Sequence, residues 1–177
     1  MTIRFAVSTI AAVVLLSACG AWQSVSDTSA SAYRAVFFKQ VKVLNVDFTA
    51  RAALNPDDAG RATSVAVRVY QLTDRTMFDG ASYEDLLKND KTVLAQDLES
   101  NMSATVNPGA SAGLSQPMRR DTKYVGIVAL YRSPGGDGSW KRVVEVKKLD
   151  ADKPLRLELS ANELRVVGEA LRYEMSR

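Results

Sequence analysis

Apolar and polar side chains alternate along most of this chain, which is the pattern of β-strands with one buried face. In the segment 41–50 the apolar residues Leu44, Val46 and Phe48 share one face. The other face carries Val43, Asn45, Asp47 and Thr49. Residues 123–132 form a nearly continuous apolar run, which is typical of a strand in the middle of a sheet. Similar signals predict further strands at 64–72, 100–106, 114–118, 140–149, 155–159 and 164–167.

One segment, 82–98, breaks this rhythm and predicts a small helical insertion. Ser82 is a good N-cap, and two carboxylates follow it in the first turn, where they stabilise the helix dipole. Leu86 and Leu87 are predicted to face the core, and the apolar residues after them predict a second short helix or an irregular stretch. The chain is therefore predicted to be all-β, a sandwich of about eight strands with a helical insertion, rather than a series of βαβ units.

The first 18 residues follow neither pattern and predict a signal peptide. Arg4 precedes an apolar run over 5–16, which is shorter than the roughly 20 residues of a membrane-spanning helix. The run ends in the pattern of a bacterial lipoprotein signal, or lipobox: Leu16, Ser17, Ala18 and Cys19. We therefore expect cleavage before Cys19, S-diacylglycerol on its sulfur and an acyl group on the new amino terminus. An ordinary secretory signal with a chance cysteine, or an uncleaved anchor, is the alternative.

These signals divide the chain into three parts. Residues 1–18 are the predicted signal peptide, 19–35 the acylated cysteine with a tether rich in Ser and Ala, and 36–177 the sandwich domain. Two points stay open. Residues 30–40 fit a short helix or an early strand, and Trp22 fits the membrane interface or a loosely packed tail.

Composition argues against most enzyme classes. The chain contains no histidine, which excludes Ser-His-Asp catalysis and the zinc hydrolase motifs. Acylation of Cys19, the single cysteine, leaves no thiol for a disulfide or a nucleophile. The 23 Lys and Arg residues against 20 Asp and Glu give a net charge of +3, too balanced to indicate nucleic-acid binding. We predict no enzyme activity, no metal, and no cofactor beyond the lipid on Cys19.

The loop after the first strand superficially resembles a calcium site. Asn55, Asp57 and Gly60 match positions 1, 3 and 6 of an EF-hand loop. Ala59 and Ala66 occupy positions 5 and 12, where oxygen ligands are required, so the match fails. The loop is therefore predicted to be a structural turn or an exposed binding loop.

Three other candidate motifs have simple structural explanations. The carboxylate pairs at 57–58 and 84–85 are adjacent in sequence, so they cannot face each other across a glycosidic bond. The glycine-rich loop 135–138 lacks the third glycine of a dinucleotide fingerprint and predicts a hairpin connection. A basic stripe interleaved with valines predicts a solvated sheet face or a patch for phosphate or lipid headgroups: Lys141, Arg142, Lys147 and Lys148.

Four stretches carry a family resemblance. The first is the lipobox, and the second is Ala-Leu-Asn-Pro-Asp-Asp-Ala-Gly-Arg at 53–61 followed by Val-Ala-Val-Arg-Val-Tyr-Gln-Leu at 65–72. The third is Phe78 ahead of 83–87 and 94–98, and the fourth is Asn-Pro-Gly at 107–109 ahead of the strand 124–131. Over roughly residues 40–167 the chain resembles the type VI secretion system lipoprotein family, TssJ (SciN, VasD).

The resemblance implies a transthyretin-like β-sandwich that acts as a scaffold and takes no small-molecule substrate. Members of the family are anchored on the periplasmic face of the outer membrane and bind the periplasmic C-terminal domain of TssM, with TssL in the same complex. The loop between the first two strands contacts TssM; carried over to this chain, it consists of Asn55, Pro56, Asp57, Asp58, Ala59, Gly60 and Arg61. Gly20 instead of Asp after Cys19 favours the outer membrane, by resemblance to enterobacterial lipoproteins.

The alternative interpretation is a periplasmic lipoprotein module whose sandwich binds a glycan, a lipid or a hydrolase. A glycan site requires exposed aromatic residues that share one face. The aromatic residues here lie mostly within strand or helix patterns, where core packing is expected: Tyr70, Tyr83, Tyr124, Tyr131 and Trp140.

Overall fold

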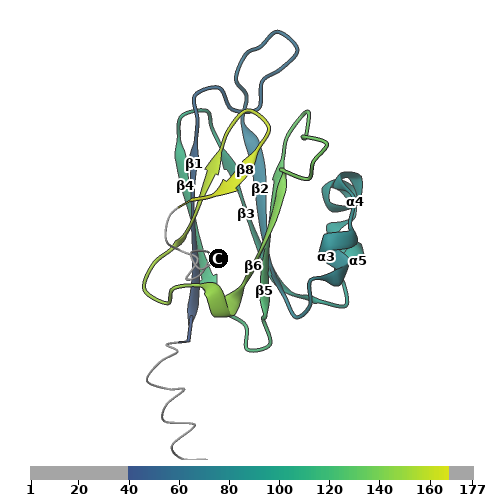
Figure 1. Cartoon of the computed structure of the whole chain (residues 1–177), viewed down its shortest axis with the longest axis vertical. Coiled ribbons are helices and arrows are strands. Elements are labelled where there is room, and N and C mark those ends of the chain that lie inside the picture. The colour runs from purple at the N-terminus through teal and green to yellow at the C-terminus, as the bar shows by residue number, and fades with distance from the viewer. Residues whose placement is uncertain (1–39, 168–177) are drawn as a thin grey trace, which may run out of the picture. The chain divides into compact units, whose positions relative to one another are not determined.

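Two four-stranded sheets form the framework of the part of the chain that the structure describes, residues 40–167. The structure is a computed structural model (Figure 1). The first sheet has the order β4-β1-β7-β8, with β1 Val43–Ala50, β4 Ser111–Pro117, β7 Leu155–Leu159 and β8 Leu164–Val166. The second has the order β3-β2-β5-β6, with β2 Val65–Leu72, β3 Leu98–Val106, β5 Tyr124–Leu130 and β6 Lys141–Glu145. The predicted all-β sandwich is confirmed.

Strand neighbours are antiparallel with one exception. β1 runs antiparallel to β4, with Val46 opposite Leu114, and parallel to β7, with Val46 opposite Leu155. In the second sheet β5 lies between β2 and β6, the inner position that its continuous apolar sequence predicts. A 3-10 turn, η1 Val146–Lys148, follows β6 and leads the chain back to the first sheet.

The core consists of the inward faces that the alternation predicts. Leu44, Val46 and Phe48 of β1 are at most 1% exposed, whereas the residues between them face solvent. They belong to one buried cluster with Val67 and Val69 of β2. Since full burial of such a side chain contributes about 1.5–3 kcal/mol, this cluster is the main stabilising element of the sandwich.

Three short helices cover the outer face of the second sheet (Figure 1): α3 Thr76–Gly80, α4 Tyr83–Lys88 and α5 Asp90–Val93. They explain why Tyr70, on the outward face of β2, is completely buried. Phe78 of α3 packs against Gly126 of β5, where a Cβ atom would come within 2.7 Å of the Phe78 ring. Only glycine therefore allows this helix to approach the sheet so closely.

The predicted helix at 82–88 is confirmed, with two differences. Ser82 caps α4, and its side chain and that of Asp85 exchange hydrogen bonds with each other's backbone in a capping box. Leu86 is buried as predicted, but the prediction for Leu87 is wrong: it is 39% exposed, because a six-residue helix on a sheet buries one face only. The hydrophobic pattern of the sequence did not predict α3, because a helix of five residues is too short to show a helical period.

Arg68 and Tyr70 attach α4 and α5 to the sheet. The Arg68 guanidinium donates to the Leu86 carbonyl oxygen over 2.8 Å and pairs with Asp90 at 3.0 Å. The Tyr70 hydroxyl donates to the same Asp90 carboxylate over 2.9 Å. Burial raises the pKa of Tyr70 well above its usual value, so the hydroxyl stays protonated and keeps donating.

Lys141 binds the end of α3. Its ammonium donates to the carbonyl oxygens of Phe78, Asp79 and Ala81 over 3.0, 2.8 and 2.9 Å. The last carbonyl groups of a helix lack partners within the helix, and a cation beside them also suits the helix dipole. This member of the predicted basic stripe is therefore an anchor for the helical insertion.

We expect Lys141→Met to lower the free energy of unfolding by about 2 kcal/mol, because charged hydrogen bonds to three backbone carbonyls are lost. Urea unfolding followed by circular dichroism measures this loss. The matched control is Lys147→Met, since the Lys147 side chain is 77% exposed and, among the described residues, forms a surface ion pair with Glu145. The control is expected to cost less than about 0.5 kcal/mol. Equal losses in both variants would contradict the anchoring role.

The connections between strands gather at two opposite ends of the sandwich. The end where β1 begins, with the turn 118–123 and residues 146–154, is termed the entry end. The opposite end, with the connections 51–64, 107–110, 131–140 and 160–163, is termed the far end (Figure 1). β1 has eight residues at about 3.3 Å each, so the two ends are about 25 Å apart.

Candidate functional site

The loop 51–64 projects beyond the other connections of the far end (Figure 1). It contains all seven residues predicted to bind a partner, Asn55 to Arg61. Of these, Asp57 is half-buried and Asn55 is 4% exposed, while the others face solvent: Pro56, Asp58, Ala59, Gly60 and Arg61. The structure thus divides the predicted segment into an exposed tip and a buried foot.

Asn55 is the foot, and it connects three segments of the far end. Its side-chain amide donates to the Ser64 carbonyl oxygen, and its side-chain oxygen accepts from the Arg132 backbone N–H, both over 2.7 Å. The Asn55 backbone N–H donates to the Ala161 carbonyl oxygen over 2.9 Å. Its φ of 44° lies in the left-handed region, which asparagine tolerates better than most residues. The side chain of this buried residue therefore fixes the loop against the loop 131–140, and its backbone N–H fixes it against the turn 160–163.

Asp57 and Arg61 close the tip into a small ring. The Asp57 backbone N–H donates to the Arg61 carbonyl oxygen, and the Asp57 carboxylate accepts from the backbone N–H groups of Ala59 and Arg61. The Arg61 guanidinium also pairs with this carboxylate at 2.7 Å. The hydrogen bond from the Arg61 side chain is the main cause that holds the pKa of Asp57 below its usual value. Gly60, with φ of +74°, supplies the left-handed residue that the ring needs.

The ring leaves Asp58 as the carboxylate offered to solvent. Asp58 is exposed, and within residues 40–167 no side chain forms an ion pair with it. The carboxylate of Asp57, by contrast, is occupied by bonds inside the tip. If the loop recognises a basic partner, Asp58 is the side chain able to meet it directly, on a support that loses little conformational entropy on docking.

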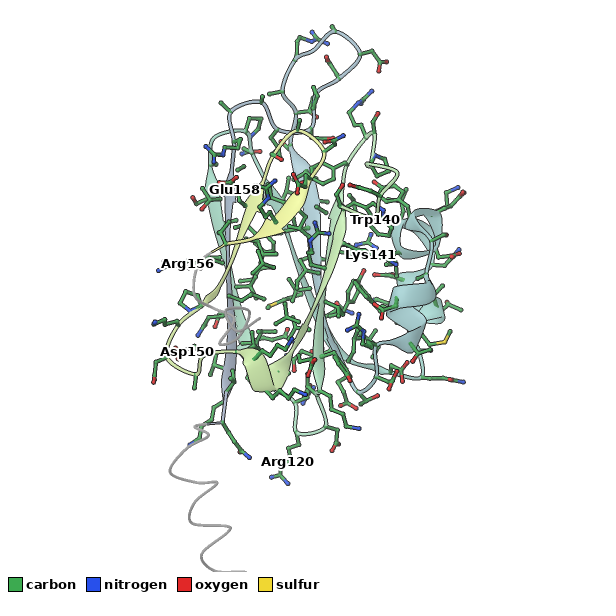
Figure 2. All side chains as sticks on the ribbon, in the orientation of Figure 1. Arg120, Trp140, Lys141, Asp150, Arg156 and Glu158 are labelled. Atoms are coloured by element: carbon green, nitrogen blue, oxygen red, sulfur yellow. The ribbon has the colours of Figure 1, made fainter. Side chains whose placement is uncertain are left out.

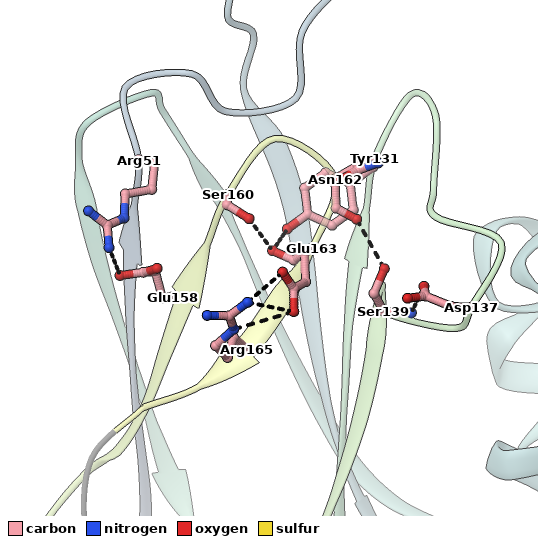
Figure 3. A network of polar contacts seen from close by, with 9 residues as sticks. All are labelled: Arg51, Tyr131, Asp137, Ser139, Glu158, Ser160, Asn162, Glu163 and Arg165. Carbon is pink, nitrogen blue, oxygen red and sulfur yellow. Dashed lines mark hydrogen bonds and ion pairs between the residues drawn. The ribbon is translucent and has the colours of Figure 1, made fainter.

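The neighbouring loops of the far end are joined by a polar network of their own (Figure 3). The hydroxyls of Tyr131 and Ser160 donate to the Glu163 carbonyl oxygen over 2.7 and 3.4 Å. The Ser139 hydroxyl donates to the Asn162 carbonyl oxygen over 3.4 Å. The turn 160–163 is thus bonded to the loop 131–140, and Asn55 connects both to the tip.

Arg132 is a far-end residue that the sequence analysis missed. Its backbone N–H binds Asn55, and its charge helps to lower the pKa of Asp57. Its exposed side chain lies beside the tip and adds a cation to this surface. Its position in the sequence could have indicated a place in the far-end loops, because it directly follows the apolar run of β5 and precedes a loop rich in glycine.

The other carboxylate pair singled out in the sequence has structural roles. Glu84 pairs with Lys88 at 2.5 Å along α4, and Asp85 closes the capping box. Within residues 40–167 no three or more His, Cys, Asp or Glu side chains gather in a way that could hold a metal ion.

A groove of about 330 Å³ lies beside the edge strands β6 and β8, and it takes in part of the basic stripe. Four cations line it: Arg75, Arg142, Lys148 and Arg165. Arg75 pairs with Asp79 and Arg165 with Glu163, while Arg142 donates to two backbone carbonyl oxygens. Because these cations are largely satisfied within the domain, the groove does not favour a phosphate or lipid site.

The five aromatic residues considered for a glycan site do not form an exposed platform in the described domain. Tyr70, Tyr131 and Trp140 are buried, and Tyr83 and Tyr124 are half-buried. The Tyr83 ring packs edge-on against Trp140, with centroids 5.0 Å apart. These five side chains therefore serve the core and the helical insertion.

The predicted signal peptide, the lipobox Leu16 to Cys19 and the tether lie outside the described residues. Cleavage before Cys19 and its acylation stay predictions from the sequence. Among the described residues, none of the helices has the length and apolar character needed to cross a bilayer.

A family model described as "Type VI secretion lipoprotein, VasD, EvfM, TssJ" matches residues 42–162. The chain belongs to this family. The matched range contains both sheets of this type VI secretion lipoprotein, except for β8, and the whole of the loop 51–64. The family is one of structural lipoproteins of a secretion system and is not a known enzyme family.

Solved structures agree with this assignment. A chain of the structure described as "Type VI membrane complex" is 34% identical, with a TM-score of 0.69 over 73% of this chain and 100% of that chain. A chain of the structure described as "T6SS protein TssM C-terminal domain (869-1107) from EAEC" is 30% identical, with a TM-score of 0.65 over 72% and 99%. The lipoprotein TssJ1 from Pseudomonas aeruginosa is 26% identical, with a TM-score of 0.60 over 71% and 95%. No curated protein matches the chain significantly in sequence.

Proposed function

We propose that this lipoprotein is an outer-membrane scaffold of a type VI secretion membrane complex. Residues 1–18 are removed, Cys19 carries the diacylglycerol and the acyl chain, residues 19–35 form the tether, and the sandwich domain in 36–177 faces the periplasm. Two or more acyl chains give stable anchoring, because each buried CH₂ contributes about 0.8 kcal/mol. The domain binds the periplasmic C-terminal domain of TssM, with TssL in the same complex, and needs no cofactor, nucleic acid or small-molecule substrate.

One observation carries the partner assignment. The chain is 30% identical to a chain of the structure described as "T6SS protein TssM C-terminal domain (869-1107) from EAEC". The match covers 99% of that chain. A second match, at 34% identity, comes from a structure described as "Type VI membrane complex". The first match supports a place for this lipoprotein beside TssM, and the second supports a place in a type VI membrane complex.

The arrangement of the domain suits a bridge between a membrane and a protein. Residues 19–42 precede β1, so an anchor on Cys19 is tied to the entry end of the sandwich. The loop 51–64 lies at the far end, about 25 Å away along β1. An anchored domain of this shape can offer its loop to a partner while its other end stays close to the bilayer. Anchoring also raises the effective concentration at which the two proteins meet.

The tip of the loop is the proposed contact surface: Pro56, Asp58, Ala59, Gly60 and Arg61. Its conformation is fixed before binding by the ring between Asp57 and Arg61 and by the buried Asn55. A preformed loop loses less entropy on docking than a mobile one. The free carboxylate of Asp58 is expected to meet a basic patch on TssM.

We expect Asp58→Lys to weaken binding to the purified periplasmic C-terminal domain of TssM about tenfold, mainly through a slower association rate, because charge complementarity acts chiefly on encounter. The salt dependence of association should fall with it. The melting temperature should stay unchanged, since no side chain of residues 40–167 pairs with Asp58. Surface-based kinetics on the mature, unacylated chain at two salt concentrations measure these quantities.

The matched control is Asp121→Lys, which makes the same charge change on an exposed residue of the entry end. Its association rate with TssM is expected to equal that of the unmodified chain. A normal rate for Asp58→Lys, or an equal loss in both variants, would remove the tip from the interface.

A further inference from the structure

The turn 118–123, which joins β4 to β5, forms the extreme point of the entry end. The Thr122 backbone N–H donates to the Arg119 carbonyl oxygen over 3.3 Å, which places Arg120 and Asp121 at the centre of a tight turn. Figure 2 shows Arg120 at this extremity, with its side chain directed away from the sandwich. The turn therefore presents its charges outward, at the end opposite to the loop 51–64.

A buried glutamine holds the turn in place. Gln71 of β2 is completely buried, and its amide donates to the Pro117 carbonyl oxygen over 3.0 Å. Its side-chain oxygen accepts from the Arg119 backbone N–H over 2.8 Å and from the Thr122 hydroxyl over 3.0 Å. A buried polar side chain that uses both its donor and its acceptor on one turn makes that turn a fixed feature of the fold.

Four exposed cations gather on and beside this turn, and they are here termed the basic tip: Lys42, Arg119, Arg120 and Lys123. The Met118 backbone N–H donates to the Lys42 carbonyl oxygen over 2.9 Å, which brings Lys42 next to Arg119. Lys123 follows the turn and is tied to Leu72 by its backbone N–H. In the described part of the chain, none of the four cations forms an ion pair.

The acids near the basic tip do not cancel its charge. Asp121 lies within the turn. The pKa of Asp74 is lowered chiefly by the hydrogen bond from the Thr76 side chain, and the charge of Lys123 makes a smaller contribution. The Asp74 carboxylate is already bonded to the backbone N–H and the hydroxyl of Thr76 at the start of α3. The four cations of the basic tip therefore outnumber these two acids, whereas at the far end Arg51 and Arg61 are paired with Glu158 and Asp57.

We propose that the basic tip docks on the phosphate groups of anionic lipid headgroups in the membrane that holds the acylated Cys19. The proposal rests on the proposed function only in that it takes the anchor to be a lipid on Cys19. The chain connects that anchor to the entry end, and Lys42 of the basic tip is the first charged residue of the described part after it. A basic cluster beside an acyl anchor adds a second, electrostatic attachment to the bilayer.

Docking of the basic tip would set the orientation of the domain. A lipid on Cys19 alone fixes one point and leaves the sandwich free to turn. Contact through a rigid turn at the entry end directs the loop 51–64 away from the bilayer, where a partner spanning the periplasm would meet it. Val43, 43% exposed beside Pro117, adds an apolar side chain to the same end.

The test uses the mature chain from residue 19 with Cys19→Ser, which lacks the acyl groups but contains both sheets and the complete described core. Binding is measured by co-sedimentation with vesicles of equal parts phosphatidylglycerol and phosphatidylcholine, and with vesicles of phosphatidylcholine alone. Each basic residue at an anionic surface is worth about fivefold in binding. Arg119→Gln with Arg120→Gln is therefore expected to lower the partition coefficient on the anionic vesicles about 25-fold.

The matched control removes the same two charges elsewhere, with Arg132→Gln at the far end and Arg156→Gln on β7 (labelled in Figure 2). It is expected to bind anionic vesicles within about twofold of the parent chain. Neutral vesicles should bind none of the chains, and added salt should release the parent chain. Equal losses in both double variants, or no loss in the Arg119/Arg120 variant, would overturn the proposal.

This experiment is independent of the partner assignment. It contains no TssM and no acyl chain, so loss of vesicle binding leaves the TssM proposal standing. Conversely, a chain that fails to bind TssM can still bind anionic vesicles through the basic tip. Circular dichroism of each variant confirms that the fold is retained, since the four substituted side chains are exposed.

Discussion

Cys19→Ser is expected to remove the domain from the outer membrane and to abolish secretion while the fold stays intact. Serine provides no thiol for the diacylglyceryl group, and without that group the signal peptidase step that follows does not take place at this site. Residues 43–166 contain the strands of both sheets, so nothing in the described core depends on Cys19. Membrane fractionation together with a secretion assay measures the effect, and circular dichroism of the purified mature chain checks the fold.

Gly20→Asp is the matched control for Cys19→Ser because it keeps the acylated cysteine. It is expected to leave the protein in the membrane fraction and, where enterobacterial sorting operates, to move it from the outer to the inner membrane. The pair of variants separates the need for a lipid from the need for a particular membrane. A Cys19→Ser chain that still fractionates with the outer membrane and supports secretion would contradict the lipoprotein assignment of this site.

Asn55→Ala is expected to lower the free energy of unfolding by about 3 kcal/mol and to abolish TssM binding. Two backbone groups, the Arg132 N–H and the Ser64 carbonyl, lose their hydrogen-bond partner, and each costs about 1–3 kcal/mol where it stays unsatisfied. Alanine also has to adopt a φ of 44°, which costs roughly 1 kcal/mol more. Chemical unfolding and a TssM titration on the same sample measure both effects.

Two further variants give this prediction its controls. Asn55→Gly removes the same side-chain bonds but accepts the left-handed backbone, so it should be more stable than Asn55→Ala by about 1 kcal/mol. Asn45→Ala removes an exposed amide bonded to Ser115 and should cost less than about 0.5 kcal/mol. An Asn55→Ala chain with the stability of the unmodified protein would show that the far-end loops do not depend on this residue.

Local patterns predicted the strands and the capped helix because each is encoded within a few neighbouring residues. The alternation of Leu44, Val46 and Phe48 matches the buried face of β1, and the run at 123–132 matches the inner strand β5. Ser82 and Asp85, which form the capping box, are three residues apart, and this spacing is visible in the sequence. Such features need no knowledge of the rest of the fold.

Features that depend on distant contacts could not be predicted in the same way. The parallel pairing of β1 with β7 joins segments more than a hundred residues apart, and α3 is held by Lys141 from another strand. Leu87 was predicted to face the core together with Leu86, but the second side of α4 faces solvent.

The candidate loop illustrates the same limit at the level of single side chains. Its sequence predicted a loop with two acidic residues available to a partner, and the structure gives those residues different environments. Asp57 is bonded to Arg61 within the tip, and Asp58 faces solvent. Asn55 belongs to the predicted segment, yet its partners Arg132 and Ala161 lie far along the chain, so its buried position could not be foreseen. The assignment of these residues to a TssM interface stays a prediction.

Site-specific photo-crosslinking in intact cells tests the central claim most directly. A photoreactive amino acid replaces Ala59 at the exposed tip in one strain and Thr105, an exposed residue of β3, in another. We expect an adduct with TssM, detected by antibody and mass spectrometry, from position 59 and none from position 105. An adduct with TssM from position 105 alone, or adducts from position 59 only with other proteins, would contradict it.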